Sequence, residues 1–398
     1  MTSRRTTLCL AMGSALALAL TACGDTSEGG GGSSSDDPIK IMVLGSFSQP
    51  PMVVPQVATG AQAAVDRVNA DGGIDGRDVE LLSCDDEGNP NGAAACARQA
   101  VEEDVAAVVG ALTFFGDSVV PLLERAEIPY ILPLAVSAKE GQSPISFPVF
   151  SSATAAVGSL AGAAGAGCQQ VAQLTNDVAT ARLANEEFVE PAAQALGVTM
   201  TPYYVPATST DIGPFVSQAL GAGADCFSYG VGPQLTSAAL VALNQAGADV
   251  TNTSNALAMP EVLLGQIPEE SEGFLAVSNF YYPSTGEEVA VQAEEDIHGV
   301  DSGASVDDSS LNSYAAVLVF AQAAEQADEI TGPGVLNALN SMDSFDVGLF
   351  PAVDLADAGF IEAFPRVAAS VLPVYRAEGG HYVPSGQPNV ELLPIFTN

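Results

Sequence analysis

The sequence predicts an α/β protein built from two lobes, each containing a doubly wound parallel sheet. Two observations support this fold class. From Pro38 onwards, short and continuously apolar runs alternate with longer amphipathic stretches, and the alternation occurs as two sets in series. Strands that are apolar along their whole length are typical of parallel sheets covered by helices on both faces. The 398 residues are enough for two such lobes.

The first set of elements extends from Ile39 to Leu134. Its first helix carries Val57, Ala61, Ala64 and other apolar residues at helical spacing, and Gly72-Gly73 ends it. The strands expected in this set are Ile39–Leu44, Val79–Ser83, Ala106–Gly110 and Tyr130–Leu134, and the helices are Pro55–Ala70, Asn91–Glu103 and Asp117–Glu127.

The second set has the same alternation. Its expected strands are Gln170–Leu174, Val198–Tyr204, Cys226–Tyr229 and Phe274–Val277, and its helices are Ala153–Ala164, Ala181–Leu196, Ile212–Leu220 and Gln234–Ala246. A further helix is expected at Tyr314–Gln326. Ala368–Tyr375 and His381–Val383 resemble a closing hairpin around Glu378-Gly379-Gly380.

The N-terminus has the layout of an export signal. Arg4 and Arg5 precede the apolar run Leu8–Leu20, and Leu20-Thr21-Ala22-Cys23 resembles a lipobox, in which the cysteine thiol is acylated. We therefore expect a signal peptide at 1–22 and lipidation of Cys23. The alternatives are a plain secretory signal and a membrane-spanning anchor, although the 15 residues from Leu8 to Ala22 fall short of the ~20 that a bilayer requires.

The segment 23–37 is rich in Gly, Ser and Asp, which predicts a flexible tether between the membrane and the globular body. The chain carries 48 acidic residues against 11 Lys and Arg. Removal of the leader takes Arg4 and Arg5 with it. Nucleic-acid binding is excluded, since it requires clustered basic residues. The sequence therefore predicts an extracytoplasmic protein, lipid-anchored to the outer face of the cytoplasmic membrane.

Four cysteines remain in the body after Cys9 and Cys23 are set aside. An even number in an exported protein favours two disulfides. Of the three connectivities, local order favours Cys84–Cys96 and Cys168–Cys226, and free buried thiols are the alternative for the second pair. No CxxC motif or Cys/His cluster is present, so we expect no metal site.

No motif nominates a catalytic centre. GxSxG, HExxH and phosphate-loop patterns are absent, and the two histidines, His298 and His381, are far apart in the sequence. Asp85-Asp86-Glu87 could bind a hard cation, but an acidic surface loop is the simpler interpretation. We expect a protein that is not an enzyme and uses no cofactor.

Ligands of parallel sheets bind at the carboxyl ends of the strands. The segments that follow the expected strands in this way are Ser46–Pro51, Ala111–Asp117, Ala135–Lys139 and Thr175–Ala181.

Several stretches, in the same order along the chain, resemble the branched-chain amino-acid (leucine/isoleucine/valine) ABC-transporter binding proteins. They are Ile39–Ile41, Gly60–Arg77, Val79–Asp86, Val105–Gly110, Ile128–Pro133 and Ala222–Asp225. Asn69–Arg77 is the most specific of them, and the matches cover most of the chain from Pro38 to about Gln326.

The resemblance implies a type I periplasmic-binding-protein fold, in which two lobes joined by three crossovers close on a small ligand. It places lobe 1 at 38–151 plus 282–345 and lobe 2 at 152–281 plus 346–398. It also implies a monomer that presents its ligand to an ABC permease in the membrane. A ligand-sensing subunit of a membrane signalling receptor is the first alternative, and a secreted enzyme is the second.

The resemblance also implies where the ligand contacts lie. Donors for a ligand carboxylate fall near Thr113 and Ala135-Val136-Ser137. The family's second-lobe aromatic residues fall near Thr180 and Val231, and its ammonium-binding acid falls near Asn255. An ammonium without an acidic partner is costly to bury, so these departures predict a ligand without one. Phe47, Phe114 and Phe115 would add apolar walls. The expected ligand is an apolar or aromatic carboxylate or a neutral amide, with a branched-chain amino acid as the family's usual ligand.

Overall fold

The computed structural model describes residues 37–49, 53–206 and 208–397, and for Thr180 it describes the backbone alone. The signal peptide expected at 1–22, Cys23 and all of the tether except Asp37 lie outside the described residues. Within these residues, no helix is both long and apolar enough to cross a bilayer.

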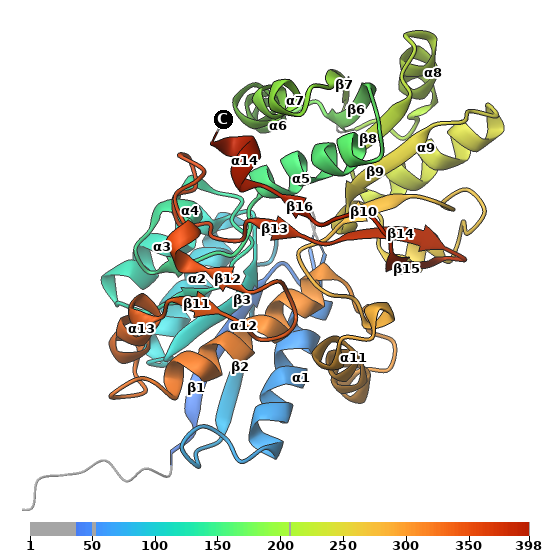
Figure 1. The fold of residues 1–398 in the computed structure, drawn as a ribbon. Helices are drawn as coiled ribbons and strands as arrows, with labels where there is room; N and C mark the ends of the chain where they lie inside the picture. The colour runs from blue at the N-terminus through green and yellow to red at the C-terminus, as the bar shows by residue number, and fades with distance from the viewer. Residues whose placement is uncertain (1–36, 50–52, 207, 398) are drawn as a thin grey trace, which may run out of the picture. The chain divides into compact units, whose positions relative to one another are not determined.

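The first sheet is parallel and has the strand order β2-β1-β3-β4-β5. Its strands β1, β2 and β3 are labelled in the lower half of Figure 1. Its strands are β1 Ile39–Gly45, β2 Val79–Asp85, β3 Ala107–Leu112, β4 Tyr130–Ile131 and β5 Ser146–Phe147. Alternate residues of β1 face opposite sides, because Ile41 and Val43 belong to one core cluster and Met42 and Leu44 to another. The sheet is thus buried on both faces, as its continuous apolar strands predict.

Helices cover both faces of the first sheet. α1 (Gln56–Ala70), α11 (Glu288–Val300) and α12 (Asp308–Ala324) pack on one face, while α2 (Pro90–Glu102) and α3 (Gly116–Arg125) pack on the other. α13 (Gly332–Ser341) packs beside α12. Gly60 allows α1 and α12 to approach closely, since a Cβ at this position would lie 2.2 Å from the carbonyl oxygen of Ser310.

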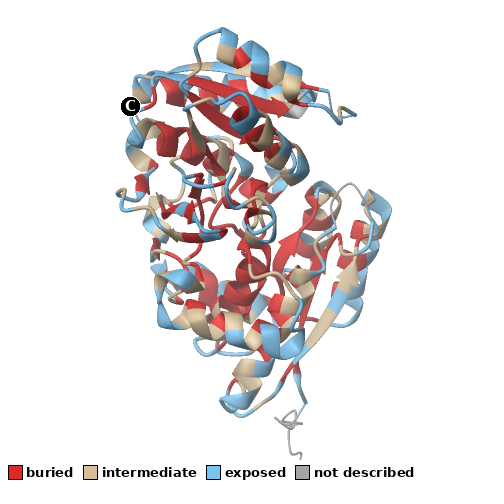
Figure 2. Cartoon of the chain, turned by 90° about the vertical axis from the view of Figure 1, so that its right-hand side faces the viewer, coloured by how far each residue is buried: buried red, intermediate tan, exposed pale blue. Residues whose placement is uncertain are grey.

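The second sheet has the order β15-β14-β10-β9-β8-β6-β7 and is parallel from β10 to β7. Its strands are β6 Gln170–Asn176, β7 Thr199–Val205, β8 Cys226–Gly230, β9 Thr251–Asn255, β10 Leu275–Val277, β14 Val374–Glu378 and β15 His381–Pro384. The helices α5 (Ser152–Gly165) and α7 (Glu190–Leu196) share one core cluster with this sheet, and α8 (Gly213–Gly221) and α9 (Pro233–Gln245) share another. Figure 2 shows buried residues concentrated on the strands and exposed residues on the outer sides of the helices.

Short elements complete the described fold. They are α4 Ala138–Gln142, α6 Ala179–Ala184, the π-helix η1 Asn185–Val189, the 3₁₀ turns η2 Ala256–Ala258, η3 Pro283–Thr285 and η4 Leu355–Asp357, α10 Glu261–Leu264, α14 Leu393–Phe396, and the two small sheets β11 Ser344–Phe345 with β12 Val353–Asp354 and β13 Val371–Leu372 with β16 Val390–Glu391.

The structure confirms the α/β fold class and most of the expected elements, but several differ. β4 is shorter than Tyr130–Leu134 because Leu132 has a φ of 46° and leaves the extended conformation. The helix expected at Ala181–Leu196 is interrupted by the π-helix η1. α12 begins at Asp308, six residues before the expected Tyr314, since its first turn is polar and carries no apolar pattern.

The hairpin expected near the C-terminus is present. β14 and β15 pair antiparallel around Gly379 and Gly380, both of which have positive φ as a tight hairpin turn requires. The expected first strand is divided, because Val371 and Leu372 pair with β16 instead.

The chain passes between the two sheets near Phe150, near Ser278 and after Ala369. The core cluster that covers the first sheet includes Phe350 and Val353 and extends to Ala369, whereas Leu372 belongs to a cluster on the second sheet. The boundaries of the two lobes given from the sequence stay a prediction.

Both disulfides favoured by the sequence are present. Cys84–Cys96 and Cys168–Cys226 have Cα–Cα distances of 5.6 and 5.9 Å. Among the described residues, Cys168, Asp225 and Cys226 form the cluster whose ligand atoms are close enough to hold a metal ion. Because both thiols are used in the disulfide, this cluster has no thiolate to offer a metal.

Candidate functional site

Two adjoining cavities are lined by residues from elements of both sheets. The inner cavity has a volume of about 300 Å³. Most of its lining residues come from α5, β6, β8 and β9 of the second sheet, and Leu134 and Asp308 come from elements that pack on the first. Its polar lining residues are Ser152, Ser159, Gln173, Thr175, Asn185, Ser228, Asn255, Asn279 and Asp308. None of its lining residues is Lys, Arg or His.

The outer cavity has a volume of about 540 Å³ and shares Leu134 and Leu257 with the inner one. Its apolar lining residues are Val53, Val54, Leu112, Leu134, Pro233, Leu257, Pro260, Val262 and Leu263. Val53, before α1, is 51% exposed, and Val262, in α10 beside the second sheet, is 58% exposed. Large apolar side chains exposed on both sides of one cavity would be covered if the lobes moved closer together.

Asp308 is the carboxylate of the inner cavity and the first residue of α12. Its Oδ1 accepts hydrogen bonds from the Ser278 hydroxyl at 2.8 Å and the Tyr282 hydroxyl at 2.9 Å. Its Oδ2 accepts a long bond of 3.5 Å from Asn279 Nδ2, and the backbone amide of Asn279 also donates to this carboxylate. Burial raises the pKa of Asp308 to about 6, although the bonds from Ser278 and Tyr282 oppose that shift.

Two amide side chains of the second lobe reach the same cavity. Gln173, on β6, is 6% exposed, and its Oε1 has no hydrogen-bond partner. Asn185 is 2% exposed and begins the π-helix η1, while its Nδ2 donates to the Tyr204 hydroxyl at 3.4 Å. Single π-helical turns occur frequently at functional sites. Here the turn begins at a residue that lines the cavity.

The first-lobe residues expected to bind a carboxylate are instead bonded within the protein. The Thr113 hydroxyl, fully buried, donates to Asp86 Oδ2 at 2.5 Å, and the Ser46 hydroxyl donates to the same carboxylate at 2.8 Å. The backbone amides of Val136 and Ser137 donate to Glu140 Oε2 at 3.2 and 2.9 Å. These donors are not among the lining residues of either cavity.

Glu140 completes a capping box with Ser137 at the start of α4. Burial raises the pKa of Glu140 to about 7, against the opposing effect of the bonds from Ser137 and Val136. Ala135, beside them, is buried and forms an isolated bridge with Ser151.

Of the remaining expected residues, Asn255 lines the inner cavity, and its Oδ1 accepts a hydrogen bond from the Ala258 amide at 3.1 Å. Val231 is buried in the core of the second sheet, and Phe47 packs against the core of the first. Phe114 is 49% exposed, and Phe115 packs against the α2–α3 side. The Thr180 side chain lies outside the described residues. Ligand binding by these residues stays a prediction.

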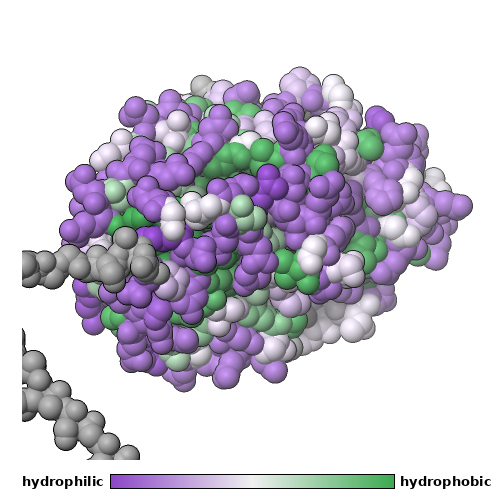
Figure 3. Space-filling model, turned by 90° about the horizontal axis from the view of Figure 1, so that it is seen from below, coloured by the Kyte–Doolittle hydropathy of each residue, from purple (hydrophilic) through white to green (hydrophobic). Residues whose placement is uncertain are grey.

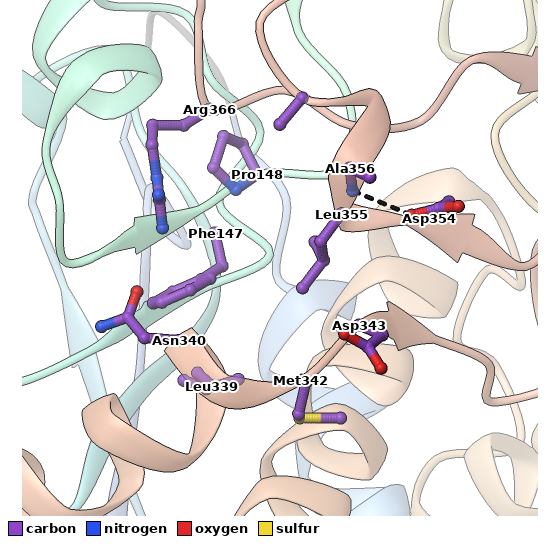
Figure 4. A pocket seen from close by; sticks show the side chains of 11 residues that line it. Phe147, Pro148, Leu339, Asn340, Met342, Asp343, Asp354, Leu355, Ala356 and Arg366 are labelled. Carbon is purple, nitrogen blue, oxygen red and sulfur yellow. Dashed lines mark hydrogen bonds between the residues drawn. The ribbon is translucent and has the colours of Figure 1, made fainter.

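A separate cavity of about 370 Å³ lies among elements that pack with the core of the first sheet (Figure 4). The guanidinium group of Arg366 lies 4.8 Å from the centre of the Phe147 ring, and its Nε donates to the Ser146 carbonyl. The carboxylates of Asp343 and Asp354 come from the opposite side. This cavity shares no lining residue with the two inter-lobe cavities.

The sequence matches the family described as periplasmic binding protein over residues 38–364, which is most of the globular body. The chain belongs to the periplasmic binding protein family. This confirms the family to which the sequence motifs point. A search among curated proteins finds no significant match.

Solved structures share the fold of this periplasmic binding protein at low sequence identity. A fatty acid ABC-transporter substrate-binding protein from Thermomonospora curvata has a TM-score of 0.74 at 17% identity, covering 92% of this chain and 95% of that one. A solute-binding protein from Rhodopseudomonas palustris BisB5, in complex with 3,4-dihydroxybenzoic acid, has 0.73 at 16%, covering 90% and 98%. A branched-chain amino-acid transporter protein from Thermus thermophilus with bound valine has 0.73 at 18%, covering 90% and 98%.

In this periplasmic binding protein, most of the polar residues at the inner cavity were not predicted from the sequence, including Gln173, Asp308 and Asn185. Gln173 lies inside an expected strand. A polar side chain within an otherwise apolar run is the one feature of the sequence that could have indicated a site there. Asp308 lies before the expected helix, and its partner Ser278 is 30 residues away in the sequence. Asn185 lies in an expected continuous helix, and nothing in that sequence pattern indicates a π-helix.

Proposed function

We propose that this periplasmic binding protein is the substrate-binding component of an ABC importer, which captures a small ligand between its lobes and presents it to a permease. The observation that carries the proposal is the pair of adjoining cavities lined from both sheets. Sites between two lobes suit capture by closure, because a ligand that contacts both lobes stabilises the closed arrangement.

Native mass spectrometry of the full-length protein, looking for a co-purified small molecule, tests this function. Small-angle scattering should give a smaller radius of gyration once that molecule is added back. The ligand should be recovered unchanged after prolonged incubation. Recovery of a chemically converted product would move the protein to the enzyme class.

We also propose that the protein is attached to the outer face of the cytoplasmic membrane through a lipid on Cys23. The lipobox-like sequence and the Gly/Ser-rich segment after it support this attachment. Metabolic labelling with a radioactive fatty acid should label the wild-type protein and leave Cys23→Ala unlabelled. An unlabelled wild-type protein would refute the tether but not the ligand-binding function.

The acidic surface fits this location. Figure 3 shows one face of the protein as predominantly hydrophilic, with hydrophobic residues in scattered positions. The formal net charge of −37 favours a soluble body that does not bind anionic partners. A monomeric body on a flexible tether stays our expectation for its assembly.

A further inference from the structure

We infer that the ligand is amphipathic, with a head group that donates hydrogen bonds and carries no negative charge, and with an apolar body. The head occupies the inner cavity and the body occupies the outer one. This inference rests on the proposed function, because it names the class of substrate captured between the lobes. Of the two ligand types that the sequence favours, it selects the amide over the carboxylate. It also departs from the expectation of a ligand without an ammonium group and extends the choice to amines, because Asp308 places a carboxylate at the inner cavity.

The inner cavity presents two hydrogen-bond acceptors that a ligand could use. Gln173 Oε1 is buried and has no partner, and Asp308 Oδ2 accepts a side-chain bond of 3.5 Å from Asn279 Nδ2, which leaves the carboxylate able to accept a further bond. A buried acceptor without a donor costs free energy, which a ligand N–H or O–H group would recover. Both atoms belong to residues that line the same cavity, so one head group with two donors can reach both.

The charges at the inner cavity disfavour an anionic head. Asp308 is the only charged residue among its lining residues, so a ligand carboxylate would meet a like charge and no lining cation. The donors expected for a ligand carboxylate are also occupied. The Val136 and Ser137 amides bind Glu140, and the Thr113 hydroxyl binds Asp86. The protein's own carboxylates thus take the positions expected for the ligand's carboxylate.

The outer cavity provides an apolar surface for the body of the ligand. Leu134 and Leu257 line both cavities, so a ligand that leaves the inner cavity between them enters a space walled by Val54, Leu112 and Leu263. Burying a methylene group in such surroundings tightens binding by about fourfold. Affinity should therefore rise with the length of the apolar body.

The test uses probes that share one apolar body and differ in the head group: hexanamide, hexylamine and hexanoate. Their dissociation constants for the full-length protein are measured by calorimetry at pH 7.5. We expect hexanamide and hexylamine to bind at least tenfold more tightly than hexanoate. Across an amide series from propanamide to octanamide, each added methylene should tighten binding by about fourfold. Equal or tighter binding of hexanoate would overturn the inference.

Variants of Asp308 and Gln173, the two acceptor residues, test whether the head group binds at the inner cavity. Asp308→Asn retains an oxygen that can accept from Ser278 and Tyr282, and it should reduce the preference for hexylamine over hexanoate at least tenfold. Gln173→Leu should weaken hexanamide binding about tenfold. Asp66→Asn removes an exposed carboxylate on α1 and serves as the matched control, with no change expected. If Asp308→Asn fails to fold, Gln173→Leu decides, and unchanged amide binding in that variant overturns the inference.

The failure of the inference and that of the proposed function are distinguishable. If a carboxylate co-purifies or binds more tightly than the amide and the amine, the ligand class is wrong while capture by this protein stands. If no head group binds at any chain length and no small molecule co-purifies, the inference falls together with the proposed function.

Discussion

The two lobes present different surfaces to the space between them. In the first lobe, the loops after β3 and β4 use their donors internally, where Thr113 binds Asp86 and the Ser137 amide binds Glu140. In the second lobe, Gln173 presents a buried acceptor without a partner at a cavity that Asn255 also lines. Polar groups at the carboxyl ends of the strands thus differ between the lobes in whether the protein itself uses them. Ligand binding by Thr113 and Ser137 stays a prediction.

The difference suggests separate roles for the two surfaces. The loops of the first lobe are bonded to buried carboxylates. Asp86 joins segments that are far apart in the sequence, and Glu140 caps a helix. Such loops support the outer cavity through Leu112 and Leu134, which lie beside them in the chain. For the ligand class that we infer, the second lobe and the crossover residue Asn279, together with Asp308, would provide the polar recognition.

The largest expected effect comes from the disulfide of the second lobe. Cys168–Cys226 has a sequence separation of 58, and in the chain-entropy model a loop of that length stabilises the fold by about 4 kcal/mol. The double variant Cys168→Ala and Cys226→Ala should lose about this free energy of unfolding in urea denaturation. The bond lies before β6 and at the start of β8, at the opposite end from the cavity, so ligand preference should not change.

The first-lobe disulfide is the matched control. Cys84–Cys96 has a sequence separation of 12, for which the same model gives about 3 kcal/mol. A greater loss from removing Cys84–Cys96 than from removing Cys168–Cys226 would contradict the loop-length argument.

Asp86→Ala tests whether the first-lobe loops depend on internal bonding. The substitution leaves the Ser46 and Thr113 hydroxyls and the Gly88 amide without their acceptor. Unfolding free energy should fall by about 3 kcal/mol, since hydrogen bonds to a charged group are the stronger kind. Asn255→Ala, which removes one bond to the Ala258 amide, should cost only about 1 kcal/mol. Similar losses in the two variants would remove the contrast between the lobes.

The contrast between buried apolar strands and polar sites also explains which parts of this structure could be predicted from the sequence. Strands such as β1 and β3 are apolar runs, so burial alone identifies them. β9 was not expected, because Thr251–Asn255 is polar throughout, and its buried hydroxyls are satisfied by carbonyls of Ser159 and Tyr229 that only the fold brings close. The polar residues of the inner cavity pose the same problem. The resemblance identified Asn255, but whether a donor such as Thr113 is free depends on contacts between distant segments.

Glu140 makes the stability of the first lobe depend on pH. Its pKa is raised from 4.5 to about 7 by burial, so between these values the folded protein binds more protons than the unfolded chain. Stability should therefore fall as pH rises, by about 2 kcal/mol between pH 5 and pH 7 from this group. Urea denaturation of Glu140→Gln should show a weaker dependence. The pH dependence that remains in Glu140→Gln should come partly from Asp308, whose pKa is raised to about 6. A wild-type protein whose stability rises over this range would contradict the assignment.

The smallest expected effect is a change of ligand preference at Asn255, the position where the family's ammonium-binding acid falls. In Asn255→Asp the carboxylate can still accept the bond from the Ala258 amide, so the turn η2 should be retained. The added negative charge at the inner cavity should raise the affinity for hexylamine relative to hexanamide by about tenfold, or ~1.4 kcal/mol. Asn337→Asp adds the same charge at an exposed position of α13 and should leave the ratio unchanged. Competition calorimetry with the two probes measures the ratio. If Asn255→Asp and Asn337→Asp behave alike, the head group does not contact Asn255, and polar recognition is confined to Gln173, Asp308 and their immediate neighbours.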